Sequence, residues 1–163
     1  MEQIDRLNSK IINIAELERL LARLRFLNKK IVFTNGCFDI IHRGHVEYLM
    51  KANELGDVMF LGLNSDSSIR KLKGNNRPVQ DQVSRAKILA SMIFISYVIL
   101  FDEETPYNLI KIVQPDILVK GGDYDIKNIV GYDIVTGKGG QVLTIPFVEG
   151  YSTSAIIKKL EQD

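Results

Sequence analysis

Short apolar runs alternate with amphipathic stretches along the chain. The runs are rich in β-branched and aromatic residues and are bounded by polar turns, which is typical of buried strands. They predict five strands, at Lys30–Thr34, Asp57–Asn64, Tyr97–Phe101, Asp116–Val119 and Gln141–Pro146. Strands that alternate with helices predict a Rossmann-like, three-layer α/β sandwich, with a five-stranded parallel sheet and helices on both faces.

The stretches between the strands carry helical signals. Asn13 followed by Glu16 predicts a capping box, and leucines then recur at helical spacing as far as Leu27. A second helix, closed by Gly56, is expected to turn one face inward. That face contains Val46, Leu49, Met50 and Asn53. Further helices are predicted at Ser67–Leu72, at Gln80–Ile93 with Val83 inward, at 105–113, at Ile126–Thr136 and at Thr153–Leu160.

Composition narrows the class of protein. The 163 residues suit one domain, and we expect residues 1–28 to form a helical extension packed on it. A net charge of +1 gives no reason to expect a nucleic-acid partner, and a single cysteine fits a reducing compartment. Met1–Lys10 is polar and Ile88–Phe101 is too short to span a bilayer, so no membrane partner and a cytoplasmic location are expected.

Four polar turns follow predicted strands. They are Thr34–Asp39, Asn64–Asp66, Lys120–Asp123 and Glu149–Ser154. Parallel sheets bind ligands at the carboxyl ends of their strands, where the strand order reverses. The turns therefore predict one site at that edge.

The first of these turns leads directly into both histidines of the chain, His42 and His45. A glycine turn that opens a helix is a prepared anion site, and two histidines there could stabilise charge on a phosphate. They could instead bind a metal, although zinc usually takes three or four protein ligands. They could also serve only to cap or pack the helix.

Basic and hydroxyl side chains could complete a phosphate site. Lys71, Lys73 and Arg77 lie on a glycine-containing loop that we expect to be mobile and able to close on an anion, although charged surface loops are common. Lys120 precedes two glycines, and Ser152 stands among hydroxyls that could cap the last helix or bind phosphate oxygens. The chain contains no GxxxxGK[ST] or GxGxxG sequence.

The segment NGCFDIIHRGH, residues 35–45, resembles the GxFDxxHxGH signature of the cytidylyltransferase-like nucleotidyltransferases. EGYSTS, residues 149–154, resembles the second signature of that family, with Tyr151 in place of an isoleucine. Within the family, the segments at residues 63–92, 101–124 and 148–157 are most similar to the adenylyltransferases that make ADP-heptose from a heptose 1-phosphate for lipopolysaccharide core synthesis. In many bacteria that activity is fused to a sugar kinase.

The resemblance implies transfer of AMP from ATP to a sugar 1-phosphate, with release of pyrophosphate. It implies catalytic roles for His42, His45, Lys71 and Lys73. It implies nucleotide binding by Phe33, Thr34, Asn35, Gly36, Cys37, Phe38, His45, Lys120, Gly121, Asp123, Glu149, Tyr151, Ser152 and Thr153. It implies acceptor binding by Asp39, Asn64, Asp66, Arg77 and Arg85.

Mg²⁺ is expected to arrive on ATP, with no ligand set made by protein side chains alone. Three other functions remain open at this point. They are a cytidylyltransferase acting on glycerol 3-phosphate or a related alditol phosphate, a non-catalytic nucleotide-binding module, and a zinc hydrolase. From the residues alone, Cys37 is a small buried residue and Arg85 forms an exposed salt bridge. The first long helix could cover the sheet or contribute to a homodimer.

Overall fold

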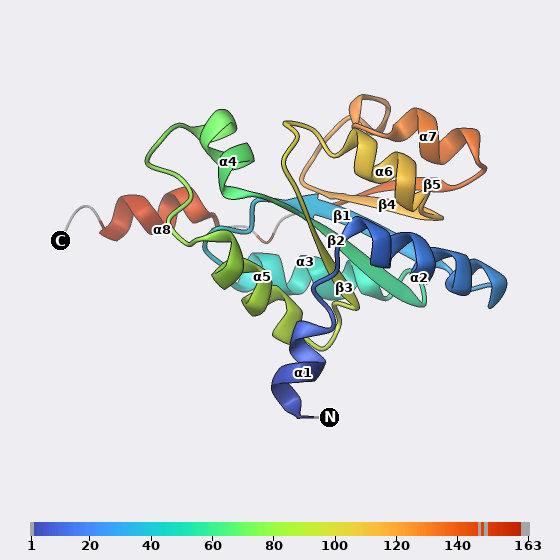
Figure 1. Ribbon diagram of the computed structural model, residues 1–163. Coiled ribbons are helices and arrows are strands. Elements are labelled where there is room, and N and C mark those ends of the chain that lie inside the picture. The colour runs from blue at the N-terminus through green and yellow to red at the C-terminus, as the bar shows by residue number, and fades with distance from the viewer. Residues whose placement is uncertain (1, 147, 149, 161–163) are drawn as a thin grey trace.

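Five parallel strands form one sheet, in the order β3-β2-β1-β4-β5 (Figure 1). The computed structural model describes residues 2–146, 148 and 150–160. The strands are β1 (Ile31–Gly36), β2 (Val58–Asn64), β3 (Tyr97–Phe101), β4 (Ile117–Gly121) and β5 (Gln141–Ile145). The α/β class and the parallel sheet predicted from the apolar runs are confirmed.

The strand order reverses beside β1. The chain places β2 and β3 on one side of β1, then crosses to the other side and adds β4 and β5. β1 pairs with β2 from Ile31 opposite Val58 to Gly36 opposite Leu63, so both strands end together. The carboxyl ends of β1 and β4 therefore form the point of reversal, where such sheets bind ligands.

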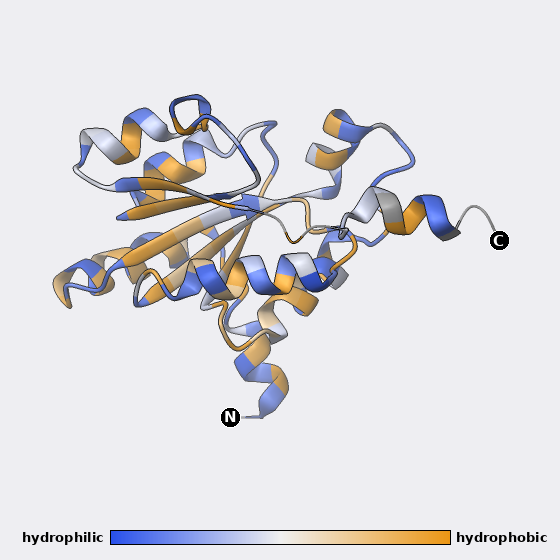
Figure 2. Cartoon of the chain, turned by 180° about the vertical axis from the view of Figure 1, so that it is seen from behind, coloured by the Kyte–Doolittle hydropathy of each residue, from blue (hydrophilic) through white to orange (hydrophobic). Residues whose placement is uncertain are grey.

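Helices cover both faces of the sheet (Figures 1 and 2). α2 (Ile14–Phe26), α6 (Tyr107–Val113) and α7 (Tyr132–Gly137) pack on one face, and α3 (Arg43–Asn53) and α5 (Gln82–Ser91) on the other. Along β1 the side chains alternate: Ile31 and Phe33 enter the first core and Val32 enters the second. This is the two-sided burial that a run of continuous apolar residues predicts.

The predicted capping box of α2 is confirmed. The Asn13 side chain accepts from the Glu16 N–H at 3.0 Å, and the Glu16 carboxylate accepts from the Asn13 N–H at 2.8 Å. Ahead of it lies α1 (Gln3–Asn8), which the apolar pattern did not predict. After α1 the chain runs beside β3, where the Ile12 N–H donates to the Val98 carbonyl, and so covers that edge of the sheet.

Three predicted details are wrong. Met50 and Val83 are exposed, because the buried face of α3 is made by residues such as Tyr48 and that of α5 by residues such as Leu89. The single helix predicted at Ile126–Thr136 is a 3₁₀ turn, η1 (Ile126–Asn128), followed by α7. Gly131 separates the two, since its φ of 89° is incompatible with a continuous right-handed helix.

The two remaining helices flank the site. They are α4 (Asp66–Lys73), after β2, and α8 (Thr153–Leu160), at the end of the described chain. Among the described residues, no helix is long and apolar enough to cross a membrane.

Candidate active site

The turn from β1 into α3 brings an aromatic ring against a glycine. Phe38 has a φ of 44°, and its ring lies over Gly36, where an added Cβ would be 2.9 Å from Phe38 Cε2. The close approach requires glycine at residue 36. The same ring meets His45 edge-on, with centroids 5.3 Å apart.

The two histidines form a stacked pair at the start of α3. His42 is the N-cap residue and His45 lies in the first turn, and their ring centroids are 3.9 Å apart with planes inclined by 27°. On the other side of His42 the ring of Tyr151 lies at 6.4 Å, and the guanidinium of Arg43 lies 5.7 Å from the centroid of the tyrosine. The segment before α8 is thereby held over the histidines, and Thr153 Oγ1 donates to the Ile40 carbonyl at 3.3 Å.

Both imidazoles are held in the neutral form. Burial, the neighbouring His42 and the charge of Lys73 lower the pKa of His45 to about 4. Burial also lowers the pKa of His42. The Nδ1 atoms of both rings are buried and have no hydrogen-bond partner among the described residues. Buried polar atoms are nearly always satisfied, so two orphaned nitrogens in one place indicate a site that a ligand completes.

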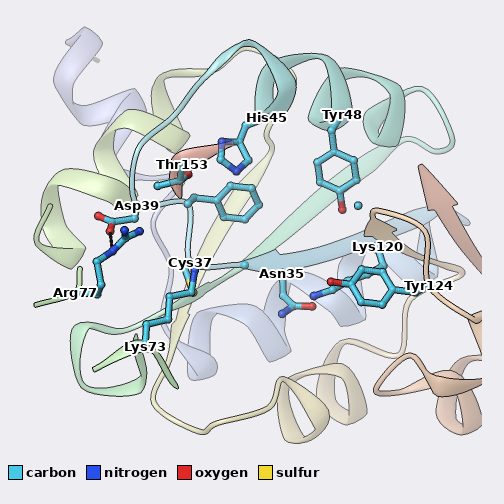
Figure 3. A pocket seen from close by; sticks show the side chains of 13 residues that line it. Asn35, Cys37, Asp39, His45, Tyr48, Lys73, Arg77, Lys120, Tyr124 and Thr153 are labelled. Carbon is cyan, nitrogen blue, oxygen red and sulfur yellow. Dashed lines mark ion pairs between the residues drawn. The ribbon is translucent and has the colours of Figure 1, made fainter. Parts of the chain in front are cut away.

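A cavity opens beside this pair at the point where the strand order reverses (Figure 3). Its walls come from β1, the turn that follows β1, α3, the end of α4, β4 and the start of α8. The lining residues are Asn35, Gly36, Cys37, Phe38, Asp39, His45, Tyr48, Lys73, Arg77, Lys120, Gly121, Tyr124 and Thr153.

The cavity is electropositive. It holds three cations, Lys73, Arg77 and Lys120, and one carboxylate, Asp39, which already contacts Arg77 at 2.8 Å. Burial lowers the pKa of Lys120, so this ammonium is partly removed from water. Desolvated cations next to the open start of a helix favour an anion of high charge density, such as a phosphate chain.

Most residues predicted to bind nucleotide line this cavity, and some lie elsewhere. Phe33 is wholly buried in the core, and Thr34 is buried against the Tyr48 hydroxyl, so neither side chain reaches the cavity. Asp123, Tyr151 and Ser152 do not line it. Glu149 lies outside the described residues.

Lys71 and Lys73, which were predicted on a loop, lie in the last turn of α4 and have different surroundings. Lys73 lines the cavity and is close enough to His45 to lower its pKa. Lys71 does not line the cavity. It lies near Asp102, after β3, whose pKa is lowered mainly by hydrogen bonds from Ser65 and Ser67 and to a lesser extent by the charge of Lys71. Both lysines were predicted to face the phosphates. Of the two, only Lys73 lies where it could contact a phosphate in the cavity.

Three residues predicted to bind the acceptor bond with the protein instead. Arg85 is 1% exposed and forms an ion pair with Asp66 at 2.7 Å, so the interpretation as an exposed salt bridge is wrong. Asn64 is also buried, and its amide donates to Ser68 Oγ at 3.0 Å. These polar groups form hydrogen bonds and an ion pair within the protein. Of the predicted acceptor residues, only Asp39 and Arg77 line the cavity.

Two tyrosines in the cavity wall were not predicted. Tyr48 is 4% exposed, and its hydroxyl bonds to Thr34 Oγ1 and donates to the Val119 carbonyl at 3.2 Å, which ties α3 to β1 and β4. Its position three residues after His45 on a helix was the available signal. Tyr124 comes shortly after Gly121 and Gly122 at the end of β4, and no pattern in the sequence indicated that it would line the cavity.

Within the part of the chain that the structure describes, no three His, Cys, Asp or Glu side chains are grouped so that they could hold a metal ion. Cys37 is half-buried, so the prediction of a buried residue is wrong. It lines the cavity with His45 and with Asp39, whose carboxylate is already bonded. The zinc-hydrolase alternative therefore has no set of ligands among these residues.

Comparison with known proteins places this arrangement in a family. The model of the family described as cytidylyltransferase-like matches residues 33–159. A bifunctional protein HldE of Aliarcobacter butzleri is 53% identical over 156 residues, which are 96% of this chain and 32% of that protein. A bifunctional protein HldE of Campylobacter jejuni subsp. doylei is 54% identical over 148 residues, 91% of this chain and 31% of that protein. The chain thus spans about a third of the length of these relatives.

Solved structures share the fold. The lipopolysaccharide core biosynthesis protein of Thermoplasma volcanium is similar with a TM-score of 0.61 at 27% identity, over 76% of this chain and 99% of that chain. A pantoate-beta-alanine ligase from Francisella tularensis, at 15% identity and a TM-score of 0.60, covers 94% of this chain and 78% of its own and shares the fold alone. The histidine pair at the strand reversal and the match over residues 33–159 lead to one conclusion: the chain belongs to the cytidylyltransferase-like family.

Proposed function

We propose that the protein transfers AMP from ATP to a heptose 1-phosphate, giving ADP-heptose and pyrophosphate. The observation that carries the proposal is the stacked, neutral pair of His42 and His45, with orphaned Nδ1 atoms beside a cavity that holds three cations. Relatives that are more than half identical over the matched third of their length are named HldE, and a structural neighbour is named for lipopolysaccharide core biosynthesis.

The reaction needs positioning and charge stabilisation rather than a covalent enzyme intermediate. An oxygen of the sugar phosphate attacks the α-phosphorus of ATP and forms a new P–O bond, while the bond to the β-phosphate breaks and pyrophosphate leaves in line. In the transition state negative charge is spread over the non-bridging oxygens of the α-phosphate and grows on the oxygen of the departing pyrophosphate. Donors that are already fixed in place stabilise this charge most effectively.

We assign these donors as follows. His45, as a neutral imidazole in the cavity wall, would donate to the α-phosphoryl group, and His42 would hold the ring of His45 in place by stacking. Lys73 and Arg77 would neutralise the phosphates that leave. Lys120, on the opposite wall at the end of β4, would neutralise the incoming sugar phosphate.

Mg²⁺ enters this scheme as part of the substrate, MgATP. Asp39, the carboxylate of the cavity, accepts two backbone N–H groups and contacts Arg77, so its oxygens are already used. A magnesium ion bound through ATP phosphates and water is consistent with this wall, since Mg²⁺ commonly keeps several waters.

The acceptor would lie in a second cavity that adjoins the first at Lys120. That cavity shares Asn35, Lys120 and Tyr124 with the first, and Asn128 adds another amide. Amides and an aromatic ring are suited to the hydroxyls and the C–H face of a sugar. A sugar bound there would direct its phosphate past Lys120 towards the histidines.

The test is pyrophosphate release by the purified protein in four combinations, ATP or CTP with heptose 1-phosphate or glycerol 3-phosphate. We expect turnover with ATP and heptose 1-phosphate, and its loss in a His45→Asn variant. Turnover only with CTP and glycerol 3-phosphate would overturn the proposal in favour of an alditol-phosphate cytidylyltransferase. ATP binding without turnover on any acceptor would instead support a nucleotide-binding module.

A further inference from the structure

The segment 77–80, between α4 and α5, is gripped from two sides by buried side chains. The carboxylate of Asp39, which is 3% exposed, accepts from the Val79 N–H at 2.9 and 3.0 Å and from the Gln80 N–H at 3.0 Å. From the other side Arg85 Nε donates to the Gln80 carbonyl at 3.0 Å. Arg77 Nε lies 2.8 Å from Asp39 Oδ2, an ion contact in which the N–H does not point along the line to the oxygen.

Arg85 carries this grip into the sheet. Its Nη1 donates to the Cys37 carbonyl at 2.7 Å and to the Asn64 carbonyl at 2.8 Å, and its Nη2 donates to Asp66 Oδ1 at 2.7 Å. One guanidinium therefore joins the turn after β1, the end of β2 and the start of α4 to the segment 77–80. We call Asp39, Arg85 and their bonds to 77–80 the clamp.

The clamp fixes the position of one cation of the cavity, Arg77. Lys73 ends α4 and Arg77 begins the clamped segment, and both line the cavity. Between them the chain passes through Gly74, whose φ is 89° and around which no atom would meet an added Cβ within 4 Å. Residues 74–76, which connect Lys73 to Arg77, are exposed. The side-chain contacts that fix the position of Arg77 over the cavity are therefore those of the clamp.

We infer that Asp39 is a positioning residue. It holds the segment 77–80, and with it Arg77, against the turn after β1, and it does not bind the acceptor or a metal. The inference rests on the proposed function in so far as the cations serve a nucleotide. Both oxygens of the carboxylate already accept a backbone N–H, and Oδ2 also contacts Arg77. The segment 77–80 is thus attached to the turn that leads from β1 into α3, and Arg77 is held in place relative to His45 at the start of α3.

The experiment compares Asp39→Asn with a matched control, Asp57→Asn. Asp57 also accepts a backbone N–H, from Lys30 at 2.8 Å, and contacts a cation, Lys29 at 3.6 Å, but it lies at the amino end of the sheet. In Asp39→Asn we expect the KM for ATP to rise about tenfold with kcat changed much less, as the loss of a charge-assisted hydrogen bond predicts. In Asp57→Asn both constants should stay near wild type.

A second measurement needs no substrate. Trypsin should cut native Asp39→Asn after Lys73 several times faster than wild type or Asp57→Asn, because release of the clamp frees the loop. Arg77→Gln removes a cation that itself faces the phosphates, so its KM should rise in any case. Its diagnostic readout is cleavage after Lys73, which should rise as in Asp39→Asn and rise little further in the double variant. That variant also keeps the test valid if Asp39→Asn does not fold.

The inference is overturned if Asp39→Asn matches Asp57→Asn in both KM and cleavage rate and Arg77→Gln matches it in cleavage rate. It is also overturned if excess Mg²⁺ restores Asp39→Asn, since Asp39 would then be a metal ligand. Failure of the proposed function looks different: wild type would not turn over heptose 1-phosphate, while the cleavage rates would still report on the clamp.

Discussion

The ring of His42 lies flat against the ring of His45, with centroids 3.9 Å apart. Two imidazolium ions could not share this geometry without strong repulsion, and burial disfavours the charge of each ring. Burial therefore keeps both rings neutral at neutral pH, and the neighbouring His42 adds to this effect on His45. Four predictions follow from the site and from the residues that build it.

The first concerns acid stability. The pKa of His45 is about 4 in the folded protein and 6.5 ordinarily, so between these values the unfolded chain binds more protons. The stabilisation is complete above pH 6.5 and is lost as the pH falls towards 4. The free energy of unfolding, measured in urea, should fall by about 1–2 kcal/mol across this window. This is less than the full linkage value because the ring is partly exposed.

The control for this prediction is His45→Asn, which should show a smaller loss of stability across the same window. A wild-type protein equally stable at both ends of the window would show that the pKa of His45 is not lowered by folding.

The second concerns Gly44, between the two histidines. A Cβ there would lie 3.1 Å from His42 Nδ1 and 3.4 Å from Tyr151 Cβ. Gly44→Ala should leave stability within about 1 kcal/mol of wild type, because alanine favours helix, but should lower kcat by roughly ten- to a hundredfold by tilting His42. Gly137→Ala is the matched control, since Gly137 ends α7 with open space around it. Equal kcat values in the two variants would refute the steric argument.

The third concerns Lys120. Partial burial of the Lys120 ammonium destabilises the fold. The charge is kept because binding of the substrate needs it. Lys120→Met keeps the chain length and removes the charge, so the melting temperature without ligand should rise by roughly 2–4 °C while the KM for the sugar phosphate increases. Lys127→Met, on the exposed η1 turn, should change neither value. A fall in melting temperature on Lys120→Met would mean that the ammonium has a stabilising partner.

The fourth concerns Arg85. Arg85→Ala leaves the Cys37, Asn64 and Gln80 carbonyls without their donor and Asp66 without its ion pair. We expect a loss of about 3–5 kcal/mol in the free energy of unfolding, measured in urea, as for other broken buried ion pairs. Arg19→Ala removes an arginine from the exposed face of α2 and should cost less than about 0.5 kcal/mol. A similar loss in the free energy of unfolding for the two variants would show that the bonds of Arg85 do not hold the site together.

Local pattern determined the elements of this protein. Apolar runs such as Tyr97–Phe101 and a capping box such as Asn13 with Glu16 act within a few residues, and both occur in the structure as the sequence predicts. The turns that carry the chemistry could be placed as well, because parallel strands all end at one edge of the sheet. His45, Lys73, Arg77 and Lys120 accordingly line one cavity.

Only the tertiary structure decided which polar side chains remain available in that cavity. Arg85 and Asp39 are equally polar in the sequence, yet both are buried, Arg85 against the carbonyls at the strand ends and Asp39 against two backbone N–H groups. Tyr48 enters the cavity wall through a register between α3 and β4 that no local pattern encodes. Availability depends on donors and acceptors brought by residues 40 or more positions away, such as Cys37 for Arg85 and Val79 for Asp39, and packing alone sets those distances.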